Sequence, residues 1–234
     1  MIEKRPFDSL GQFENDWLKA RYHFSFSGYH DPSRVHWGAL RVWNDDQIKA
    51  KSGFGPHPHS DMEIITYVRT GAITHQDSLG NRGRTEAGDV QVMSAGSGVT
   101  HAEYNLEDEA TTLYQIWIMP KERGGKPYWG AAKFPKAERA GTLVTLASGF
   151  AADQDAGALP IRQDARILAA TLQAGQSVSH RLETGRHAYL AVAKGAAKVN
   201  GVTLAMRDGA AIRDEPELTI EAGSETEIVL VDSP

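Results

Sequence analysis

Short β-rich segments, separated by turn residues, dominate the first half of the sequence. Glycine, asparagine, aspartate and proline gather between these segments, as at Thr70-Gly71 and at Leu79-Gly80-Asn81. Short strands joined by glycine-bearing turns are typical of an all-β barrel or sandwich. The sequence therefore predicts an all-β fold, with strands at 62–68, 73–77, 89–93, around His101 and at 113–119.

The strand pattern returns after one break. Residues 120–135 (PKERGGKPYWGAAKFP) combine proline, glycine and lysine, and we interpret them as the connection between two halves. A hairpin is expected at Asn200-Gly201. This weak internal duplication predicts two domains, residues 1–130 and 131–234. Strands of the second half are predicted at 167–172, 188–192, 196–199, 202–206, 218–221 and 227–232.

One short helix is expected near the N-terminus. Residues 9–20 (SLGQFENDWLKA) are charged and mixed in character, and Ser9 would serve as the N-cap. Aromatic and β-branched runs such as HFSFSGY and WGALRVW follow within 21–51 and indicate strands again.

Two same-face pairs of metal-ligating residues lie between residues 53 and 105. Alternate side chains of a strand point the same way, roughly 6–7 Å apart at Cα, so His57 pairs with His59 and His101 with Glu103. If these strands face each other, three imidazoles and one carboxylate converge. This set suits a divalent transition metal that keeps positions open for substrate. The chain has no cysteine, which excludes a thiolate site.

Glu63 is an alternative carboxylate ligand. It follows His59 by four residues and would share its face in an unbroken strand, but roughly 13 Å further along. Glu103 needs no bend in the strand and is preferred, with Glu63 as the alternative or as a supporting partner.

The remaining histidines give weaker signals. His180, Glu183 and His187 could gather around a second ion, but their mixed offsets place them on different strand faces. Lone histidines are usually structural, which is the interpretation for His23, His30, His36 and His75.

Charge and the distribution of apolar residues argue against nucleic-acid binding and against a membrane protein. A formal net charge of −5 and a pI near 6.0 argue against direct binding to nucleic acid. The first residues lack the apolar run of a signal peptide, and no segment approaches the ~18 apolar residues of a membrane span. We therefore expect a cytoplasmic protein with no membrane association.

The residues around the two pairs resemble the motifs of the cupin superfamily. His57, His59 and Glu63 fall on the first motif, and His101 and Asn105 on the second, in which serine replaces the usual proline and extra residues precede the histidine. More closely, HPHSDMEIITYVRTG and GDVQVMSAGSGVTHAEYN resemble the pirin family, including its bacterial quercetinase-like members.

The resemblance implies a bicupin fold of two tandem jelly-roll β-barrels. The first would hold one divalent metal on His57, His59, His101 and Glu103, because pirins use this glutamate as the ligand. Iron(II) is expected, with manganese, cobalt, nickel, copper and zinc also open. The second barrel would be degenerate, without His-x-His or His-x-Glu, and would cover edge strands of the first.

The resemblance also implies a function. The expected activity is that of a quercetin 2,3-dioxygenase, with a flavonol-like aromatic substrate, O2, and Glu103 as the catalytic base. Phe54, Met93 and Trp117 are candidates for the pocket wall. The alternative is a non-catalytic regulatory protein that acts through an unidentified protein partner. A cupin isomerase or hydrolase would need a further base, which the sequence does not identify.

Overall fold

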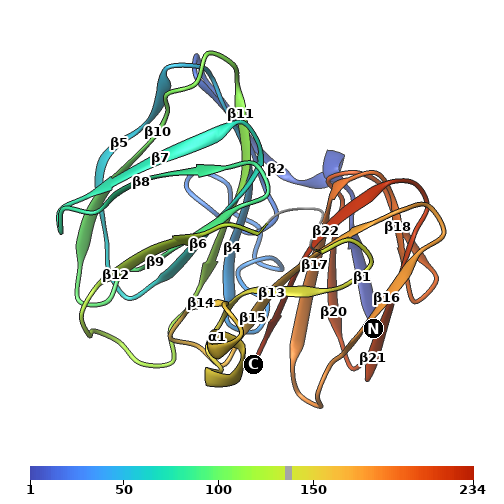
Figure 1. The fold of residues 1–234 in the computed structure, drawn as a ribbon. Helices are drawn as coiled ribbons and strands as arrows, with labels where there is room; N and C mark the ends of the chain where they lie inside the picture. The colour runs from blue at the N-terminus through green and yellow to red at the C-terminus, as the bar shows by residue number, and fades with distance from the viewer. Residues whose placement is uncertain (135–138) are drawn as a thin grey trace.

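Strands account for almost all of the regular structure in the computed structural model, which describes residues 1–134 and 139–234. In these residues the strands form four sheets, one of seven strands and one of four in each half of the chain. Figure 1 shows the two halves side by side, the N-terminal half mostly blue to green and the C-terminal half yellow to red. The all-β prediction is confirmed.

The N-terminal half places its two sheets on either side of a common interior. The seven-stranded sheet has the order β12 (Tyr128–Ala132), β9 (Val90–Ser94), β6 (Glu63–Thr70), β11 (Thr111–Ile118), β4 (Leu40–Ile48), β3 (Leu18–Tyr22) and β2 (Gly11–Glu14). The four-stranded sheet has the order β5 (Ser52–His59), β10 (Val99–Asn105), β7 (Ala72–Asp77) and β8 (Arg82–Glu86).

The C-terminal half repeats this plan. Its larger sheet has the order β1 (Ile2–Arg5), β20 (Gly209–Arg213), β17 (His187–Lys194), β22 (Thr226–Ser233), β15 (Arg166–Leu172), β13 (Val144–Ser148) and β14 (Leu159–Pro160). Its smaller sheet consists of β16 (Ser177–Arg181), β21 (Glu217–Ala222), β18 (Ala197–Val199) and β19 (Val202–Leu204). The helix α1 (Ala151–Asp155) lies between β13 and β14, which pair in parallel.

Two strands complicate the predicted division at residue 130. The strand β1 begins the chain but pairs with β20 in the C-terminal sheet. The predicted connection contains β12, which spans residue 130 and pairs with β9 of the N-terminal sheet. The last residue of the predicted connection, Pro135, lies outside the described residues. The boundary itself stays a prediction.

The core of the molecule lies between the two seven-stranded sheets. Large side chains from both halves, including Trp43, Ile65, Tyr114, Tyr189 and Val229, form one buried cluster there. Fully burying a large apolar side chain contributes about 1.5–3 kcal/mol, so this shared face binds the halves firmly together. The C-terminal half therefore covers a sheet face of the first domain, rather than only its edge strands.

The prediction of a short helix at residues 9–20 is wrong. This stretch forms the hairpin of β2 and β3, and the only helical turn nearby is a 3-10 turn at Phe7–Ser9. In β3, Leu18, Ala20 and Tyr22 are buried and alternate with more exposed basic residues. This period of two favours a strand, whose inward face packs into the domain interior. Within the described residues, no helix has the length and apolar character that a membrane crossing requires.

Candidate metal centre

Three histidines meet on two neighbouring strands of the smaller N-terminal sheet. His57 and His59 lie on β5, and His101 lies opposite His57 on β10. The edge position of β5 tolerates Pro56 and Pro58, which cannot donate to a sheet ladder. One nitrogen from each histidine lies within 4.8 Å of the others. The predicted convergence of the three imidazoles is therefore present.

Hydrogen bonds fix which ring nitrogens carry protons. The Nδ1 of His57 lies 2.7 Å from the Gly55 carbonyl oxygen, so it donates and leaves Nε2 unprotonated. Asp77 accepts from His75 Nε2 at 3.1 Å, and His75 Nδ1 then accepts from His101 Nδ1 at 3.3 Å. This series of hydrogen bonds places the His101 proton on Nδ1 and leaves its Nε2 unprotonated as well. Such partners behind a ligand orient its free nitrogen.

The two free nitrogens imply a cation between them. The Nε2 atoms of His57 and His101 lie 3.0 Å apart, and both present lone pairs. Bonds of about 2.0–2.1 Å at right angles would place two nitrogens of one metal about 3.0 Å apart. The spacing of these atoms thus fits adjacent ligands of a transition metal.

Burial keeps the imidazoles of His59 and His101 neutral. It lowers the pKa of His59 to about 4, with His101 and His57 adding to the shift. Burial also lowers the pKa of His101 to about 3, again assisted by neighbouring histidines. Neutral imidazole is the metal-binding form, so the site is competent for a metal at neutral pH.

Glu103 is held by three hydrogen-bond donors. Gln91 Nε2 and Thr66 Oγ1 donate to Oε1 at 2.6 and 3.3 Å, and Gln115 Nε2 donates to Oε2 at 2.7 Å. A carboxylate oxygen accepts at two positions, so Oε2 keeps one for a metal or a proton. A β-bulge between β5 and β10 separates Glu103 from the histidine pair, and its carboxylate lies within 4.8 Å of a ring nitrogen of His101.

Glu63, the alternative ligand, has other partners. Ser94 Oγ donates to its Oε1 at 2.7 Å, and the Arg162 amide donates to its Oε2 at 3.1 Å. The strand β5 ends at His59 and the chain turns into the other sheet, where Glu63 begins β6. Glu63 therefore contacts the C-terminal half and not the histidines.

Two expectations about the other histidines have clear outcomes. His180 lies on β16 and pairs with Asp232 at 2.9 Å. His187 lies on β17, in the other sheet of that half, and packs against Trp37. The two histidines therefore do not gather around an ion. His75 is hydrogen-bonded, as expected of a structural histidine, and its two partners are Asp77 and His101, so it lies directly behind the histidine group. The signal in the sequence was the same-face pair of His75 and Asp77 on one strand.

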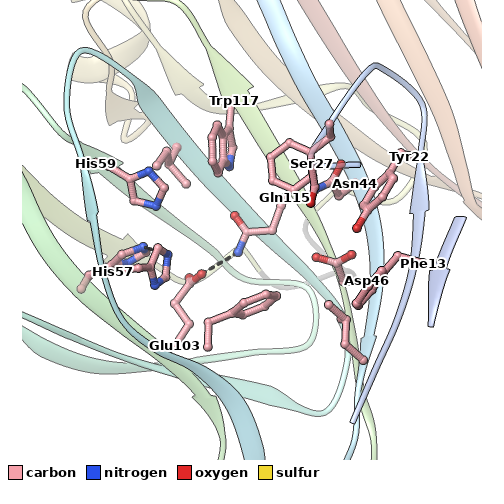
Figure 2. Close-up of a pocket in the computed structure, with 15 residues that line it drawn as sticks. Phe13, Tyr22, Ser27, Asn44, Asp46, His57, His59, Glu103, Gln115 and Trp117 are labelled. Atoms are coloured by element: carbon pink, nitrogen blue, oxygen red, sulfur yellow. Dashed lines mark hydrogen bonds between the residues drawn. The ribbon is translucent and has the colours of Figure 1, made fainter. Parts of the chain in front are cut away.

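The histidines open into a cavity inside the N-terminal domain. Its volume is about 250 Å³, close to the lower end of the roughly 300–1,000 Å³ typical of small-molecule sites. Figure 2 shows His57, His59 and Glu103 at one side, Tyr22, Asn44 and Asp46 at the other, and Gln115 between them. The wall is lined by Phe13, Leu18, Tyr22, Phe26, Ser27, Asn44, Asp46, Phe54, His57, His59, Ile64, His101, Glu103, Gln115 and Trp117.

Two of the three residues expected in the wall are there. Phe54 and Trp117 line the cavity, and Trp117 meets the His59 ring edge-on, with centroids 4.9 Å apart. Met93 lies instead in a buried apolar cluster with Ile64 and Val99. Apolar walls beside a few polar groups are the usual design of a site for a small organic molecule.

Known proteins resemble this chain along its whole length. The Pirin family model matches residues 4–118, and the model of the quercetinase C-terminal cupin domain matches residues 146–233. A pirin-like protein of Caulobacter vibrioides is 62% identical over 233 residues, 100% of both chains. A quercetin 2,3-dioxygenase of Escherichia coli is 40% identical over 235 residues, 100% of this chain and 99% of its own.

Solved structures agree with these sequence matches. The bacterial pirin YhhW from Escherichia coli, in complex with nickel(II), matches with a TM-score of 0.93 at 40% identity and covers 100% of this chain and 99% of its own. The prediction of two tandem cupin domains is confirmed by this match and by the two family models. The chain belongs to the pirin family.

Proposed function

We propose that this pirin is a metal-dependent dioxygenase that cleaves a flavonol such as quercetin with O2. The observation that carries the proposal is the opening of three clustered histidine nitrogens and a hydrogen-bonded carboxylate into an apolar-walled cavity. The similarity to a quercetin 2,3-dioxygenase along the whole chain supports the substrate class. We assign His57, His59, His101 and Glu103 as the ligands of one divalent metal, with iron(II) as the expected ion.

The reaction needs no reductant. One O2 reacts with the flavonol and opens its central ring. Both atoms of this O2 remain in the ester product, and the ring carbon that carried the 3-hydroxyl group leaves with that oxygen as carbon monoxide. The bound metal would supply a Lewis acid that stabilises the oxyanion of the deprotonated 3-hydroxyl group. Every other contribution comes from side chains of the N-terminal domain.

Glu103 would receive the 3-hydroxyl proton. The acceptor atom is Oε2, which has one hydrogen-bond donor where Oε1 has two. Its one free position would hold either the metal or the proton, so Glu103 would serve as ligand before the substrate binds and as base once the proton has moved to it. Gln115 and Gln91 hold this carboxylate in place while the proton moves. The aromatic side chains of Phe54 and Trp117 would orient the flat substrate and exclude water from the oxyanion.

The test is quercetin consumption in air by protein reconstituted separately with iron, manganese, cobalt, nickel, copper or zinc. We expect loss of the flavonol absorbance, release of carbon monoxide in equal amount, and no reaction without O2. His57→Ala should abolish turnover because it removes a ligand. His36→Ala is the matched control, since His36 is exposed and lies outside the cavity.

Absence of turnover with every bound metal would refute the dioxygenase. A regulatory protein that changes partner affinity with its metal state would then be the better explanation. Its mark would be complex formation that depends on the loaded metal and is lost in His57→Ala.

A further inference from the structure

A second polar cluster lies in the same cavity, across from the metal centre. Asn44 and Asp46 on β4 line the cavity, and they are only 4% and 2% exposed. The Oδ1 atom of each has no hydrogen-bond partner within the described part of the chain. Figure 2 shows both side chains beside Tyr22, on the side opposite His57. Neither residue has a part in the metal site or in the proton transfer.

The strand register fixes how far this cluster lies from the metal centre. Gln115, which binds Glu103 at 2.7 Å, stands directly opposite Asn44 on the neighbouring strand. Asp46 lies two residues beyond Asn44, so it is a diagonal neighbour of Gln115, at roughly 7–8 Å between Cα atoms. An aromatic molecule of two or three fused or linked rings can reach from one end to the other.

The strands that flank Asp46 give its Oδ1 atom no partner among residues 1–134 and 139–234. Its neighbours across the two adjacent strands are Ala20 and Leu113, both buried and apolar. The preceding residue, Asp45, points to the opposite face of β4, where Arg69 and Arg207 bind it. A buried polar atom without a partner destabilises a protein, and a ligand that hydrogen-bonds to it gains that energy on binding.

We propose that Asp46 and Asn44 form a binding subsite for a hydroxyl group of an aromatic ligand whose other end lies at the metal centre. A hydroxyl group donates one hydrogen bond and can accept another, so it can donate to Asn44 Oδ1 while it accepts from the carboxyl of Asp46 in its protonated form. The inference rests on the proposed function and narrows its substrate class. The subsite would favour flavonols that carry a hydroxyl group far from the 3-hydroxyl. Flavonols that carry only the metal-chelating 3-hydroxyl and its adjacent carbonyl group would bind more weakly.

Ligand binding without turnover tests the subsite. Nickel-loaded protein is titrated without O2 with quercetin and with the parent flavonol, which has only the 3-hydroxyl and the adjacent carbonyl group. Asp46→Val removes the polar atoms, and Asp46→Asn retains a hydrogen-bonding group of the same shape. Circular dichroism checks that each variant is folded.

The expected result is a change in selectivity. Wild-type protein should bind quercetin roughly tenfold more tightly than the parent flavonol, as one well-made hydrogen bond in a buried site allows. Asp46→Val should lose that preference while its affinity for the parent flavonol stays within about twofold. Asp46→Asn should keep most of the preference.

Three results would overturn the subsite. They are an unchanged quercetin preference in Asp46→Val, an equal loss of affinity for both flavonols, and failure of wild-type protein to bind quercetin. Turnover in air is measured separately, which keeps the two proposals distinguishable. Preference without turnover supports the subsite and refutes the dioxygenase, whereas turnover with unaltered preference in Asp46→Val refutes the subsite alone.

Discussion

The hydrogen bonds that hold Glu103 should control how tightly the protein binds its metal. Gln91 and Gln115 donate to opposite oxygens of this carboxylate at 2.6 and 2.7 Å, in a place where Glu103 is almost fully buried. Replacing either glutamine by methionine preserves length and removes the donor. The carboxylate then loses a donor that orients it and stabilises its charge, which makes it a weaker metal ligand.

The magnitude follows from the bonds lost. A hydrogen bond to a charged group contributes about 1.5–3 kcal/mol, which corresponds to roughly 10- to 150-fold in an equilibrium constant. Loss of partners behind a metal ligand costs about 10–100-fold in affinity in other metalloproteins, which is the same range. We therefore expect Gln91→Met and Gln115→Met each to weaken metal binding by about 10–100-fold. The double variant should be weaker still, but by less than the product, because both act on one carboxylate.

Competition with a chromophoric chelator measures these affinities. Gln47→Met is the matched control, because Gln47 is exposed on β4 of the same sheet and lies outside the cavity. Its affinity should equal that of the wild type. If Gln91→Met and Gln115→Met also bind metal within twofold of the wild type, then Glu103 is not a ligand and its hydrogen bonds serve packing alone.

Three further outcomes are expected. Gly53→Ala should weaken metal binding in the same chelator assay, because its Cβ would lie 2.2 Å from the Glu103 carbonyl oxygen, whereas Gly55→Ala meets nothing closer than 3.5 Å and should bind normally. Metal at 100 times its Kd should raise the stability by about 2.7 kcal/mol, seen as a higher Tm that a chelator reverses and His57→Ala lacks. Burial, with nearby carboxylates, raises the pKa of Asp46 well above its usual range, so its contribution to stability is lost as pH rises through that pKa. The free energy of unfolding of metal-free protein is measured in urea as a function of pH. Asp46→Asn should flatten its decline with rising pH, and a pH profile identical to that of the wild type would contradict a raised pKa of Asp46.

Strand alternation alone was sufficient to predict the two same-face pairs at the centre of the site. His57 and His59 share a face because they are two residues apart on one strand, and their rings meet with centroids 4.8 Å apart. His101 joins them because β10 pairs with β5. The alternation within each strand is a local regularity that needs no tertiary information, whereas the pairing of β10 with β5 joins distant parts of the sequence.

Other parts of the site depend on pairings that no local pattern contains. Tyr22, Asn44, Gln115, Thr66 and Gln91 stand in register across five strands and carry hydrogen-bonding groups from the far side of the cavity to Glu103. They come from distant parts of the sequence, and each by itself looks like an ordinary polar residue. Only the strand order turns them into one row.

The interpretation of the N-terminal segment failed for a related reason. The helix expected at residues 9–20 rests on charge and on an N-cap, both weak signals beside tertiary pairing. The strand β3 is held between β2 and β4, and its buried residues Leu18 and Tyr22 line the cavity. Tertiary packing outweighed local propensity there.

The two halves show how one sheet plan serves two purposes. Toward the shared core, β11 presents Tyr114 and Ile116 and β22 presents Val229, so apolar side chains of both sheets pack together on that face. On the opposite faces they differ, because β22 fills its domain interior with aliphatic residues such as Leu230, whereas β11 presents Gln115 to the cavity. An open interior with unpartnered polar atoms costs stability, which the shared core and the filled second domain offset. None of the residues described in the C-terminal half lines the cavity, yet the cavity depends on that half for the cover of its largest sheet.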